Sequence, residues 1–460
     1  MKAKDLLRLG FNEGPAVGAA LSAINKFSIE DELATVELLR VLADPDAHLQ
    51  HKWFAEVSRA LQKAKPAIMI ERAEPAPFEV WGEGIEKGAL DQMKNAARLP
   101  VAVRGALMPD AHQGYGLPIG GVLAVENAVI PYAVGVDIAC RMKLTVLDID
   151  VTQFERLRGE LSNVLERETI FGTGGAHKRP LSHDVLDEDW LVSPITRQNF
   201  EKARAQLGTS GSGNHFVEFG IIELTKPDLD LAAGKYVALL SHSGSRGTGA
   251  AVANYYSQRA REICKGLPKE LTYLAWLDMH RAEGQEYFAA MNLMGKYAAA
   301  NHDLIHKRVA KAAGARVIAG VENHHNFAWL EEHDGKQTYV HRKGATPAGV
   351  GVLGVIPGSM ATPGFVVRGK GHAPSLNSAS HGAGRAMSRT KAKESFNWPG
   401  VKPMLESVGV TLLSAGIDES PHSYKDIHSV MKAQSDLVEV IARFDPKIVK
   451  MAKEGEQPED

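Results

Sequence analysis

The chain has 460 residues, 44% apolar and 23% charged, which is the composition of a soluble globular protein of two or three domains or one large catalytic domain. A net charge of −2 excludes a globally basic surface, so any positive charge that meets a nucleic acid must be local. Only two cysteines occur, Cys140 and Cys264, which excludes a disulfide framework. We therefore expect a cytoplasmic protein without a secretory signal or a membrane span.

Residues 1–65 are predicted to form a helical extension. Gly14-Pro15 opens a segment rich in Ala and Leu, and proline suits the first turn of a helix. Acidic residues 30–32 precede ELATVELLRVLA, where the helix dipole favours negative charge. A further helix is predicted over residues 48–63. Because this block carries no chemical motif, it is interpreted first as a cap on the main domain, with a partner site or an RNA-docking element as alternatives.

The sequence pattern changes from helical to strand-like at residue 67. Alternating apolar residues in AIMIER (67–72) and FEVWG (78–82) predict strands. The Gly-rich stretch over 108–150 predicts tight turns between strands of a buried sheet. Helical periodicity returns over 251–311, and a last helix is predicted over VMKAQSDLVEVIARF, residues 430–444.

Five side chains form a candidate metal site. Asp137 and Cys140 stand three residues apart in VGVDIAC, where a carboxylate and a thiolate can share an ion and the thiolate can bridge two. His215 follows a glycine- and serine-rich turn, His242 ends a strand-like run, and His325 stands in the sequence HHN. Each residue alone is more often a buried cysteine or a satisfied histidine. Together they suit Mn, Zn, Fe or Co, although their spacing matches no local metal motif.

The segment LNSASHGAGRAMSRT, residues 376–390, is a candidate anion site. Its glycines allow backbone N–H groups to approach a phosphate, and the spacing of Arg385 and Arg389 predicts a shared helix face. His381 could attack a nucleotide phosphorus and carry it covalently. The alternative is a surface loop with a solvated histidine and a basic helix.

An ordered series of motifs runs through residues 67–450: MPDAHQGYG, VGVDIAC, GSGNHFVE, SHSGSRG, HHN, VHRKGAT, PGSM, HGAGRAMSR and YKDI. This series resembles the RtcB family of RNA-splicing ligases. The resemblance implies an α+β catalytic domain over residues 66–460, with stacked, mostly antiparallel sheets flanked by helices. A dinucleotide-binding fold is excluded, because GSGNHF lacks the required glycine spacing.

The resemblance also implies an activity. It implies a GTP-dependent ligase with two Mn²⁺ ions that joins an RNA 3′-phosphate or 2′,3′-cyclic phosphate to a 5′-hydroxyl. The reaction would pass through a guanylylated histidine. Expected partners are RNA with broken ends, including tRNA, and an activating helper protein, in RNA repair or tRNA splicing.

Site residues are implied by the motifs. His381 matches the guanylylated nucleophile. The positions that match metal ligands are Asp137, Cys140 (bridging), His215, His242 and His325. The positions that match guanylate contacts are Asn214, Glu218, His325, Asn326, Pro357, Ser359, Met360, His381, Ala383, Gly384, Tyr424 and Lys450. The positions that match RNA-phosphate contacts are Arg246, Arg385 and Arg389.

Three departures from the family pattern carry expectations. Ala139 and Arg141 replace glycines of the metal loop, which must reshape if either glycine had a positive φ. The Arg141 cation would disfavour metal unless it points away or binds phosphate. Gly364 stands where a serine is expected to contact the nucleotide. Lys450 is followed by Met451 and a tail, whereas the family ends in Lys-Gly.

Two other functions compete with the ligase. A binuclear-metal phosphoesterase would open cyclic phosphate ends without forming a covalent guanylate. A non-catalytic protein would bind RNA ends with an affinity that does not depend on His381. The presence of all five metal-type ligands and of His381 favours the ligase.

Overall fold

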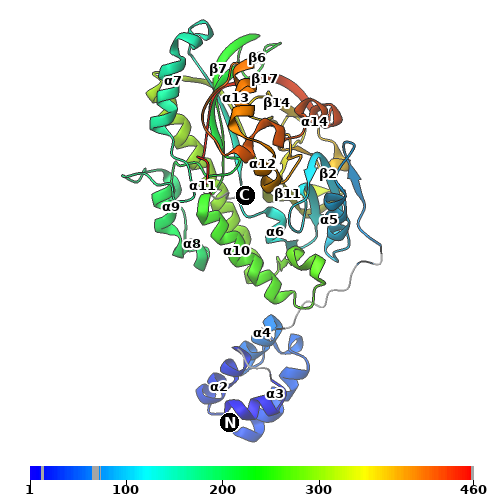
Figure 1. Cartoon of the computed structure of the whole chain (residues 1–460). Coiled ribbons are helices and arrows are strands. Elements are labelled where there is room, and N and C mark those ends of the chain that lie inside the picture. The colour runs from blue at the N-terminus through cyan, green and yellow to red at the C-terminus, as the bar shows by residue number, and fades with distance from the viewer. Residues whose placement is uncertain (12–14, 65–71, 73, 457–460) are drawn as a thin grey trace. The chain divides into compact units, whose positions relative to one another are not determined.

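The computed structural model describes residues 1–11, 15–64, 72 and 74–456 (Figure 1). The chain divides into two compact units, Met1–Ile68 with Ile263–Gly266, and Met69–Glu262 with Leu267–Asp460. The strand predicted over residues 67–72 falls, apart from residue 72, outside the described residues. The domain boundary after residue 65 stays a prediction.

The smaller unit is helical, as its sequence predicts. Apolar residues at intervals of three and four along each helix meet in one core, which includes Leu6, Phe11, Leu38 and Phe54. Its helices are α1 (Ala3–Arg8), α2 (Pro15–Phe27), α3 (Asp31–Ala43) and α4 (Ala55–Ala64), with the 3₁₀ turn η1 (Asp46–His48) before α4.

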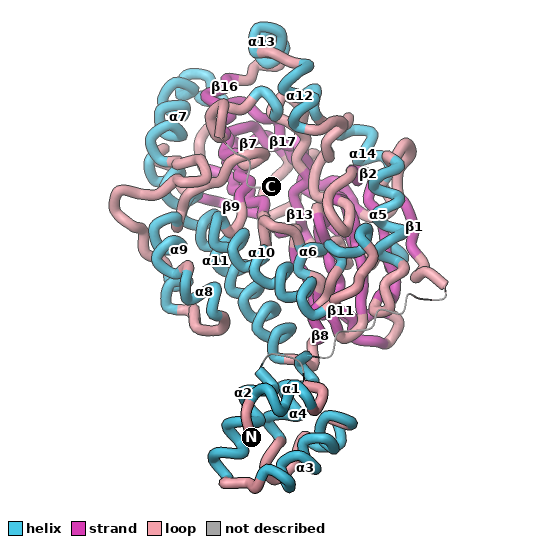
Figure 2. The backbone as a smooth tube through the Cα atoms, turned by 60° about the horizontal axis from the view of Figure 1, so that its bottom comes forward, coloured by secondary structure: helices cyan, strands magenta, loops and turns pink. Residues whose placement is uncertain are grey.

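The larger unit is built around an eight-stranded sheet (Figure 2). Neighbouring strands on its main path are antiparallel, and only β16 (Thr411–Ser414) pairs in parallel, with β17. In sheet order the strands are β13 (Leu353–Ile356), β14 (Gly364–Gly369), β17 (Val438–Met451), β6 (Phe216–Leu224), β7 (Gly234–Ser243), β5 (Arg141–Leu147) and β9 (Val317–His324).

This sheet curls until its two edge strands meet. The Asn323 side chain on β9 accepts a hydrogen bond from the Val355 N–H on β13 at 2.8 Å. Inside the curl, Met142 and Leu144 of β5 pack with Phe444 of β17 in one apolar cluster. The alternation of side chains along each strand sends these residues inward, which closes a core within the sheet itself.

Two helices cover the outer face of this sheet, α7 (Phe154–Glu168) and α11 (Ala282–Ala312), which lie together in Figure 1. Leu161 and Leu165 of α7 and Ile305 of α11 join a core with Phe219 and Leu239 from the sheet. The rigid layer formed in this way holds the ends of β5, β6 and β7, from which the candidate metal ligands come.

A second sheet has five strands, and only its β1–β2 pair is parallel. A separate core fills the space between this sheet, β13–β14 and the helix α14 (Ile427–Ala433). The strands are β1 (Phe78–Val80), β2 (Ala102–His112), β3 (Ile119–Val125), β11 (Lys336–Lys343) and β10 (Phe327–His333), and two short pairs join β12 (Ala345–Pro347) to β15 (Ser378–Ser380) and β4 (Ala128–Val129) to β8 (Leu277–Asp278). The fold is α+β with stacked, mostly antiparallel sheets, as predicted.

The last predicted helix is wrong in its second half. The helix α14 ends at Ala433, and residues from Val438 onward form β17, the longest strand. β-branched residues such as Val438 and Val440 favour a strand, and β6 and β14 supply hydrogen-bonding partners on both sides. The helical interval predicted over 251–311 is likewise interrupted, by the 3₁₀ turn η4 (Lys269–Leu274) and by β8.

The remaining helices lie at the rim of the sheets. They are α5 (Lys87–Ala97), α6 (Pro131–Val134), α8 (Pro194–Gln198), α9 (Phe200–Gln206), α10 (Arg246–Ile263), α12 (Arg389–Ser395), α13 (Trp398–Ser407) and α14 (Ile427–Ala433). Within the described ranges, none of the helices combines the length and the apolar character that crossing a bilayer requires.

Candidate active site

A cavity of about 900 Å³ opens in the larger unit, walled by both sheets and by the loops between them. Residues that are distant in sequence converge on it, among them Asp137, Cys140, His242, His325 and His381. Its size is that of a pocket for a nucleotide.

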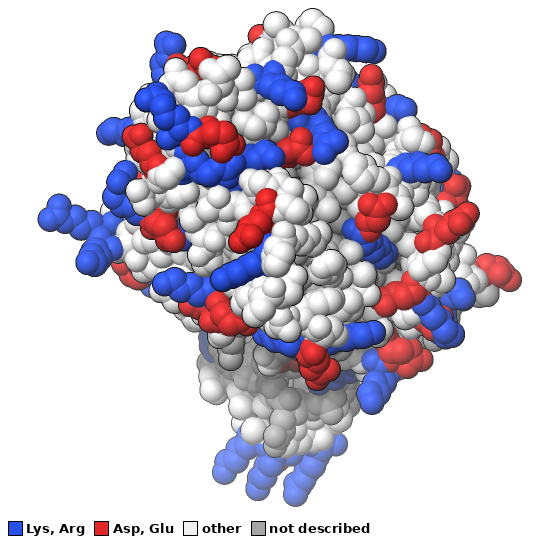
Figure 3. Space-filling view, turned by 45° about the horizontal axis from the view of Figure 1, so that its top comes forward, with Lys and Arg blue, Asp and Glu red and all other residues white. Residues whose placement is uncertain are grey.

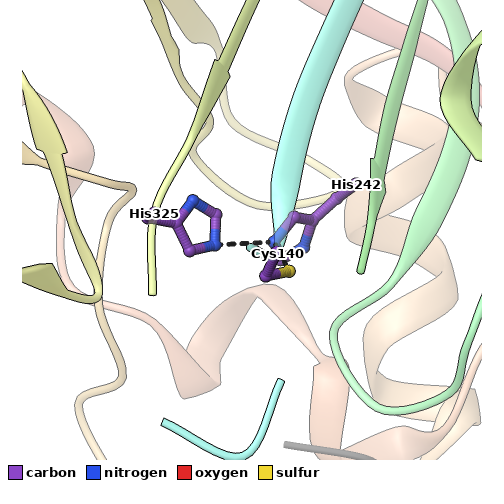
Figure 4. A group of neighbouring side chains, drawn as sticks. All are labelled: Cys140, His242 and His325. Atoms are coloured by element: carbon purple, nitrogen blue, oxygen red, sulfur yellow. Dashed lines mark hydrogen bonds between the residues drawn. The ribbon is translucent and has the colours of Figure 1, made fainter. Parts of the chain in front are cut away.

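At its base, three side chains direct their donor atoms toward one point (Figure 4). Cys140 directly precedes β5, His242 lies on β7 and His325 follows β9. The Cys140 Sγ lies 3.0 Å from the His242 Nε2, which in turn lies 3.2 Å from the His325 Nε2. β5 pairs with both β7 and β9, so the register of the sheet places the three residues side by side.

A second group shares the same thiol. The His215 Nε2 lies 3.0 Å from the Asp137 Oδ2 and 3.4 Å from the Cys140 Sγ. All three residues are buried, and each offers a ligand atom within 4.8 Å of the others. Two adjacent groups that meet at one cysteine have the geometry of a binuclear site with a bridging thiolate.

Burial sets the protonation state of the two neighbouring histidines. It lowers the pKa of His242 to about 3 and holds the pKa of His325 well below its ordinary value. Burial alone would raise the pKa of Asp137, but its hydrogen bonds to His215 and Cys140 outweigh this effect and lower it. Neutral imidazoles and a carboxylate are the forms that bind metal ions.

Backbone groups fix the orientation of these side chains. The His242 Nδ1 lies 3.1 Å from the Asn214 carbonyl, so Nδ1 carries the proton and Nε2 presents a lone pair to the cluster. The His325 N–H donates to the Cys140 carbonyl at 2.9 Å, and the Asn326 amide donates to the Asp137 carbonyl at 3.2 Å. The loop that carries Asp137 and Cys140 is therefore tied to the loop that carries His325.

The predicted nucleophile lies beside this cluster. The ring of His381 has its centre 4.9 Å from that of His325, and only 15% of its side chain is exposed. Its Nδ1 lies 2.7 Å from the Oδ2 of the fully buried Asp110, and its backbone N–H donates to the same oxygen at 3.2 Å. With the Nδ1 proton donated to Asp110, Nε2 keeps its lone pair and can act as a nucleophile.

The glycines beside His381 allow this contact. Gly384 has a φ of +72°, and a Cβ there would come within 2.1 Å of the Asp110 carbonyl oxygen. Only glycine lets the two segments approach so closely. The HGAG turn is therefore seated directly on β2, the strand that carries Asp110.

Comparison with known proteins identifies the family of this chain. The family model described as tRNA-splicing ligase RtcB matches residues 92–194 and 189–452. The chain belongs to the RtcB family. It is 35% identical over 406 residues to the RNA-splicing ligase RtcB of Escherichia coli strain K12, with 80% of this chain and 95% of that protein covered. It is 31% identical over 439 residues to the tRNA-splicing ligase RtcB of Nanoarchaeum equitans, with 79% and 91% covered.

The two substitutions in the RtcB metal loop leave the cluster intact. Ala139 adopts a φ of +55°, so the loop keeps a left-handed residue at this position without a glycine. The Arg141 guanidinium points to Glu322, whose Oε1 it meets at 2.8 Å, and to the Gly295 carbonyl at 3.3 Å. Arg141 does not line the cavity, so its charge is neutralised away from the ligand atoms.

Most of the predicted guanylate contacts share one cavity with His381. Burial raises the pKa of Glu218 well above its ordinary value, which favours the neutral form of its carboxyl group. Gly364 also lines the wall and offers no hydroxyl. The predicted contacts on the cavity wall are Asn214, Glu218, His325, Asn326, Pro357, Ser359, Met360, Ala383, Gly384 and Tyr424.

Lys450 is an exception, because it does not line the cavity in this structure, and its contact with a guanylate stays a prediction. Side chains alternate along β17, so Val449 and Met451 face the cavity while Lys450 faces away from it. The Lys450 ammonium donates to the carbonyls of Leu165, Glu166 and Thr169 at 3.1–3.2 Å. It therefore satisfies the carbonyl end of α7.

Arg246 also lies outside the cavity wall. It is only 2% exposed and does not line the cavity. Its guanidinium donates to the Thr209 hydroxyl at 3.1 Å and to the Gly172 carbonyl at 2.6 Å. In this conformation Arg246 tethers the loop that carries Gly172, and its contact with an RNA phosphate stays a prediction.

Arg385 and Arg389 line the cavity, but they do not share a helix face as predicted. The helix α12 begins at Arg389, and Arg385 lies in the preceding loop. Both reach the buried Glu419 carboxylate, which Arg389 pairs with and Arg385 approaches to 3.6 Å, and Arg389 also pairs with Asp418 at 2.9 Å. Figure 3 shows Lys and Arg side chains interspersed with Asp and Glu over the face that it draws.

Two residues of the cavity wall and the partner of His381 were missed by the sequence analysis. Asp110 and His112 stand in MPDAHQGYG, and Lys343 stands in VHRKGAT, so the quoted motifs contained them. Burial lowers the pKa of His112 to about 4 and that of Lys343 to about 7. Their polarity within apolar strands was the available signal, but only the fold shows that His112 and Lys343 line the cavity and that Asp110 meets His381.

Proposed function

We propose that this protein is a GTP- and Mn²⁺-dependent RNA ligase that joins RNA 3′-phosphate or 2′,3′-cyclic phosphate ends to 5′-hydroxyl ends. The observation that carries the proposal is the position of His381. Its imidazole is oriented by Asp110 and opens onto the same cavity as a pair of metal-type ligand groups. Its membership in the RtcB family, whose curated members are named RNA-splicing ligases, supports the activity.

The donor set fits two manganese ions. Cys140, His242 and His325 would hold one ion, and Asp137, Cys140 and His215 the other. One carboxylate, one thiolate and three neutral imidazoles suit a divalent transition metal, and all of them are buried. When bound, such ions supply Lewis-acid stabilisation of the charge on the phosphates and on the leaving group.

His381 performs the first group transfer in this proposal. Its Nε2 attacks the α-phosphorus of GTP, the bond to the β-phosphate oxygen breaks, and pyrophosphate leaves with that electron pair. The imidazole gains positive charge as the N–P bond forms, and the Asp110 carboxylate stabilises it through the Nδ1 proton. The backbone around Gly384 is close enough to hold the transferred guanylate.

RNA ends enter after guanylylation. Water first opens a cyclic end to a 3′-phosphate. An oxygen of the 3′-phosphate then attacks the guanylate phosphorus, which breaks the N–P bond and frees His381. Finally the 5′-hydroxyl attacks the 3′-phosphate, its proton is released, and GMP leaves. Each joint formed consumes one GTP and yields GMP and pyrophosphate.

The expected partners are RNA with broken ends, including tRNA, together with GTP and an activating helper protein. Arg385 and Arg389 lie at the cavity, where they can pair with RNA phosphates in addition to their own carboxylates. The two cysteines form no disulfide, which fits a reducing cytoplasm.

The test is covalent labelling with α-labelled GTP and Mn²⁺. We expect an acid-labile, alkali-stable adduct on the wild-type protein and none on His381→Ala. His422→Ala is the matched control, because this histidine lies outside the cavity wall and should leave labelling intact. A wild-type protein that binds metal but takes no label would refute the ligase proposal.

A binuclear-metal phosphoesterase is the second candidate. The orientation of Lys450 and the missing hydroxyl at Gly364 favour it, because both remove contacts expected for a guanylate. It would hydrolyse 2′,3′-cyclic ends in the presence of metal, without GTP and without an adduct. The labelling experiment therefore separates the two functions.

A further inference from the structure

Three tyrosines gather at the edge of the cavity, and neither the metal site nor the proposed chemistry uses them. They are Tyr115 in the β2–β3 loop, Tyr132 on α6 and Tyr273 on η4. The ring centres of Tyr132 and Tyr273 lie 4.8 Å apart, and those of Tyr115 and Tyr273 lie 5.5 Å apart. Tyr115 and Tyr132 are part of the cavity wall, so this tyrosine trio is continuous with the site of His381.

The trio exposes aromatic surface that a solitary domain has no reason to present. Tyr115 is 63% exposed and Tyr273 is 37% exposed, although both rings are large and apolar. Exposed aromatic rings held side by side are the platform on which proteins stack unpaired nucleobases. Their position next to a site proposed to act on RNA ends indicates what such a platform would bind.

The arrangement of the trio is held by the surrounding backbone. Gly116 has a φ of +71°, and a Cβ there would come within 2.8 Å of the Tyr273 carbonyl oxygen, so the loop carrying Tyr115 rests directly on η4. The Lys343 ammonium donates to the Tyr115 carbonyl at 2.5 Å from the opposite side. A platform fixed in this way loses little conformational entropy when a base stacks on it.

Cations flank the trio on two sides. The Arg261 guanidinium lies 5.9 Å from the centre of the Tyr273 ring, and the Lys343 ammonium lies 5.2 Å from the centre of the Tyr132 ring. A nucleotide offers an aromatic base and an anionic phosphate a few ångströms apart. The alternation of aromatic and positive groups matches that chemistry.

We propose that the tyrosine trio is a nucleobase-binding subsite that stacks the terminal base of an RNA strand whose end enters the cavity. The proposal rests on the proposed function for the identity of the ligand. The strand can be the one that carries the 3′-phosphate or the one that carries the 5′-hydroxyl. The stacking is indifferent to which base is present, because every base offers an aromatic face.

The test compares an intact terminal nucleotide with an abasic one. Fluorescence anisotropy would measure the affinity of the full-length protein for two single-stranded RNAs, one ending in a 3′-phosphate and one in a 5′-hydroxyl. Each RNA is prepared with and without the terminal base. We expect the wild type to bind the abasic form of at least one strand about tenfold more weakly.

Substitutions then test whether the tyrosine trio causes the difference in affinity between intact and abasic ends. Tyr115→Ala should bind the intact and abasic ends equally, and Tyr115→Phe should restore the preference because it keeps the ring. Tyr255→Ala is the matched control, since Tyr255 is 36% exposed and packs edge-on against Tyr256 outside the cavity wall. It should discriminate as the wild type does.

Two results would overturn the subsite. One is a wild type that does not distinguish intact from abasic ends on either strand. The other is a Tyr115→Ala protein that loses affinity for both forms equally and so keeps the discrimination. The labelling of wild-type protein by GTP is measured in parallel. If the protein forms the GTP adduct but binds intact and abasic ends equally, the subsite is refuted and the ligase proposal stands. If it binds intact ends more tightly but forms no adduct, the ligase proposal is refuted and the subsite stands.

Discussion

At the metal end of the cavity, formed by Asp137, Cys140, His215, His242 and His325, the donor atoms face one another across 3.0–3.4 Å. At the arginine end, formed by Arg385 and Arg389, each guanidinium faces a carboxylate of Asp418 or Glu419. Both ends are largely buried, but only at the arginine end does the protein itself supply groups of opposite charge, the carboxylates.

The arginine end already has its ionic partners within the chain, whereas the metal-type ligands would find theirs in a bound ion. Several ligand atoms gathered at one point suit a bound cation, so we expect the metal end to gain stability when an ion binds. A buried arginine paired with glutamate has its charge compensated on folding, so the proposed contact with RNA would be added to a structural role. Four substitutions test this contrast, from the largest expected effect to the smallest.

Cys140→Ala should remove both ions. The thiol belongs to both ligand groups, so Mn²⁺ affinity should fall on the order of a thousandfold at each position. Metal content after equilibrium dialysis is the measurement. Cys264→Ala is the matched control, because it is the other buried cysteine and should keep two ions. Retention of one tightly bound ion by Cys140→Ala would show that the thiolate does not bridge.

Glu419→Gln should destabilise the fold without any ligand present. It removes the carboxylate shared by Arg385, Arg389 and the Tyr424 hydroxyl, and it leaves buried positive charge, at a cost of about 3 kcal/mol. Chemical denaturation of metal-free protein measures the change. Asp445→Asn disrupts a solvent-exposed pair with Arg443 and should cost less than about 1 kcal/mol. Equal losses of unfolding free energy in the two variants would mean that the Glu419 carboxylate does not stabilise the buried arginines.

Asp110→Asn should slow the guanylylation of His381 by about 10- to 100-fold, because the amide still orients the ring but no longer stabilises positive charge on it. The rate of labelling in a single turnover is the measurement, at saturating Mn²⁺. Asp148→Asn, at an exposed pair with Arg316, is the control. An unchanged rate in Asp110→Asn would leave Asp110 with a purely structural role.

Ala139→Gly should be nearly neutral, within about 0.5 kcal/mol. Relief of the left-handed conformation gains about 1–2 kcal/mol, while the lost buried methyl and the greater freedom of unfolded glycine cost about as much. Ala106→Gly, in β2 and equally buried, offers no such relief and should cost about 1–2 kcal/mol. The two free energies of unfolding are compared by denaturation. A similar loss in both variants would show that Ala139 is unstrained.

The sequence by itself was enough to determine the family and the α+β class, through an ordered series of motifs that no single site would reproduce. It also predicted a set of metal-type residues, because Asp137, Cys140 and the three histidines stand in chemically unusual settings, and the structure brings them together in two adjacent groups. Their separations of tens of residues gave no local geometry. Only the register of β5 against β7 and β9 decided that Cys140 lies within reach of both His242 and His325.

Tertiary structure alone decided the direction of side chains. Lys450 and Met451 are neighbours in sequence, yet the alternation of a strand sends only Met451 into the cavity. Arg246 carries the same charge as Arg385, yet burial places it against a carbonyl. The partner of His381 was hidden for a similar reason: Asp110 lies 271 residues away, and only the close approach allowed by Gly384 brings the two together. Sequence states which chemistry is available, and packing decides which groups meet.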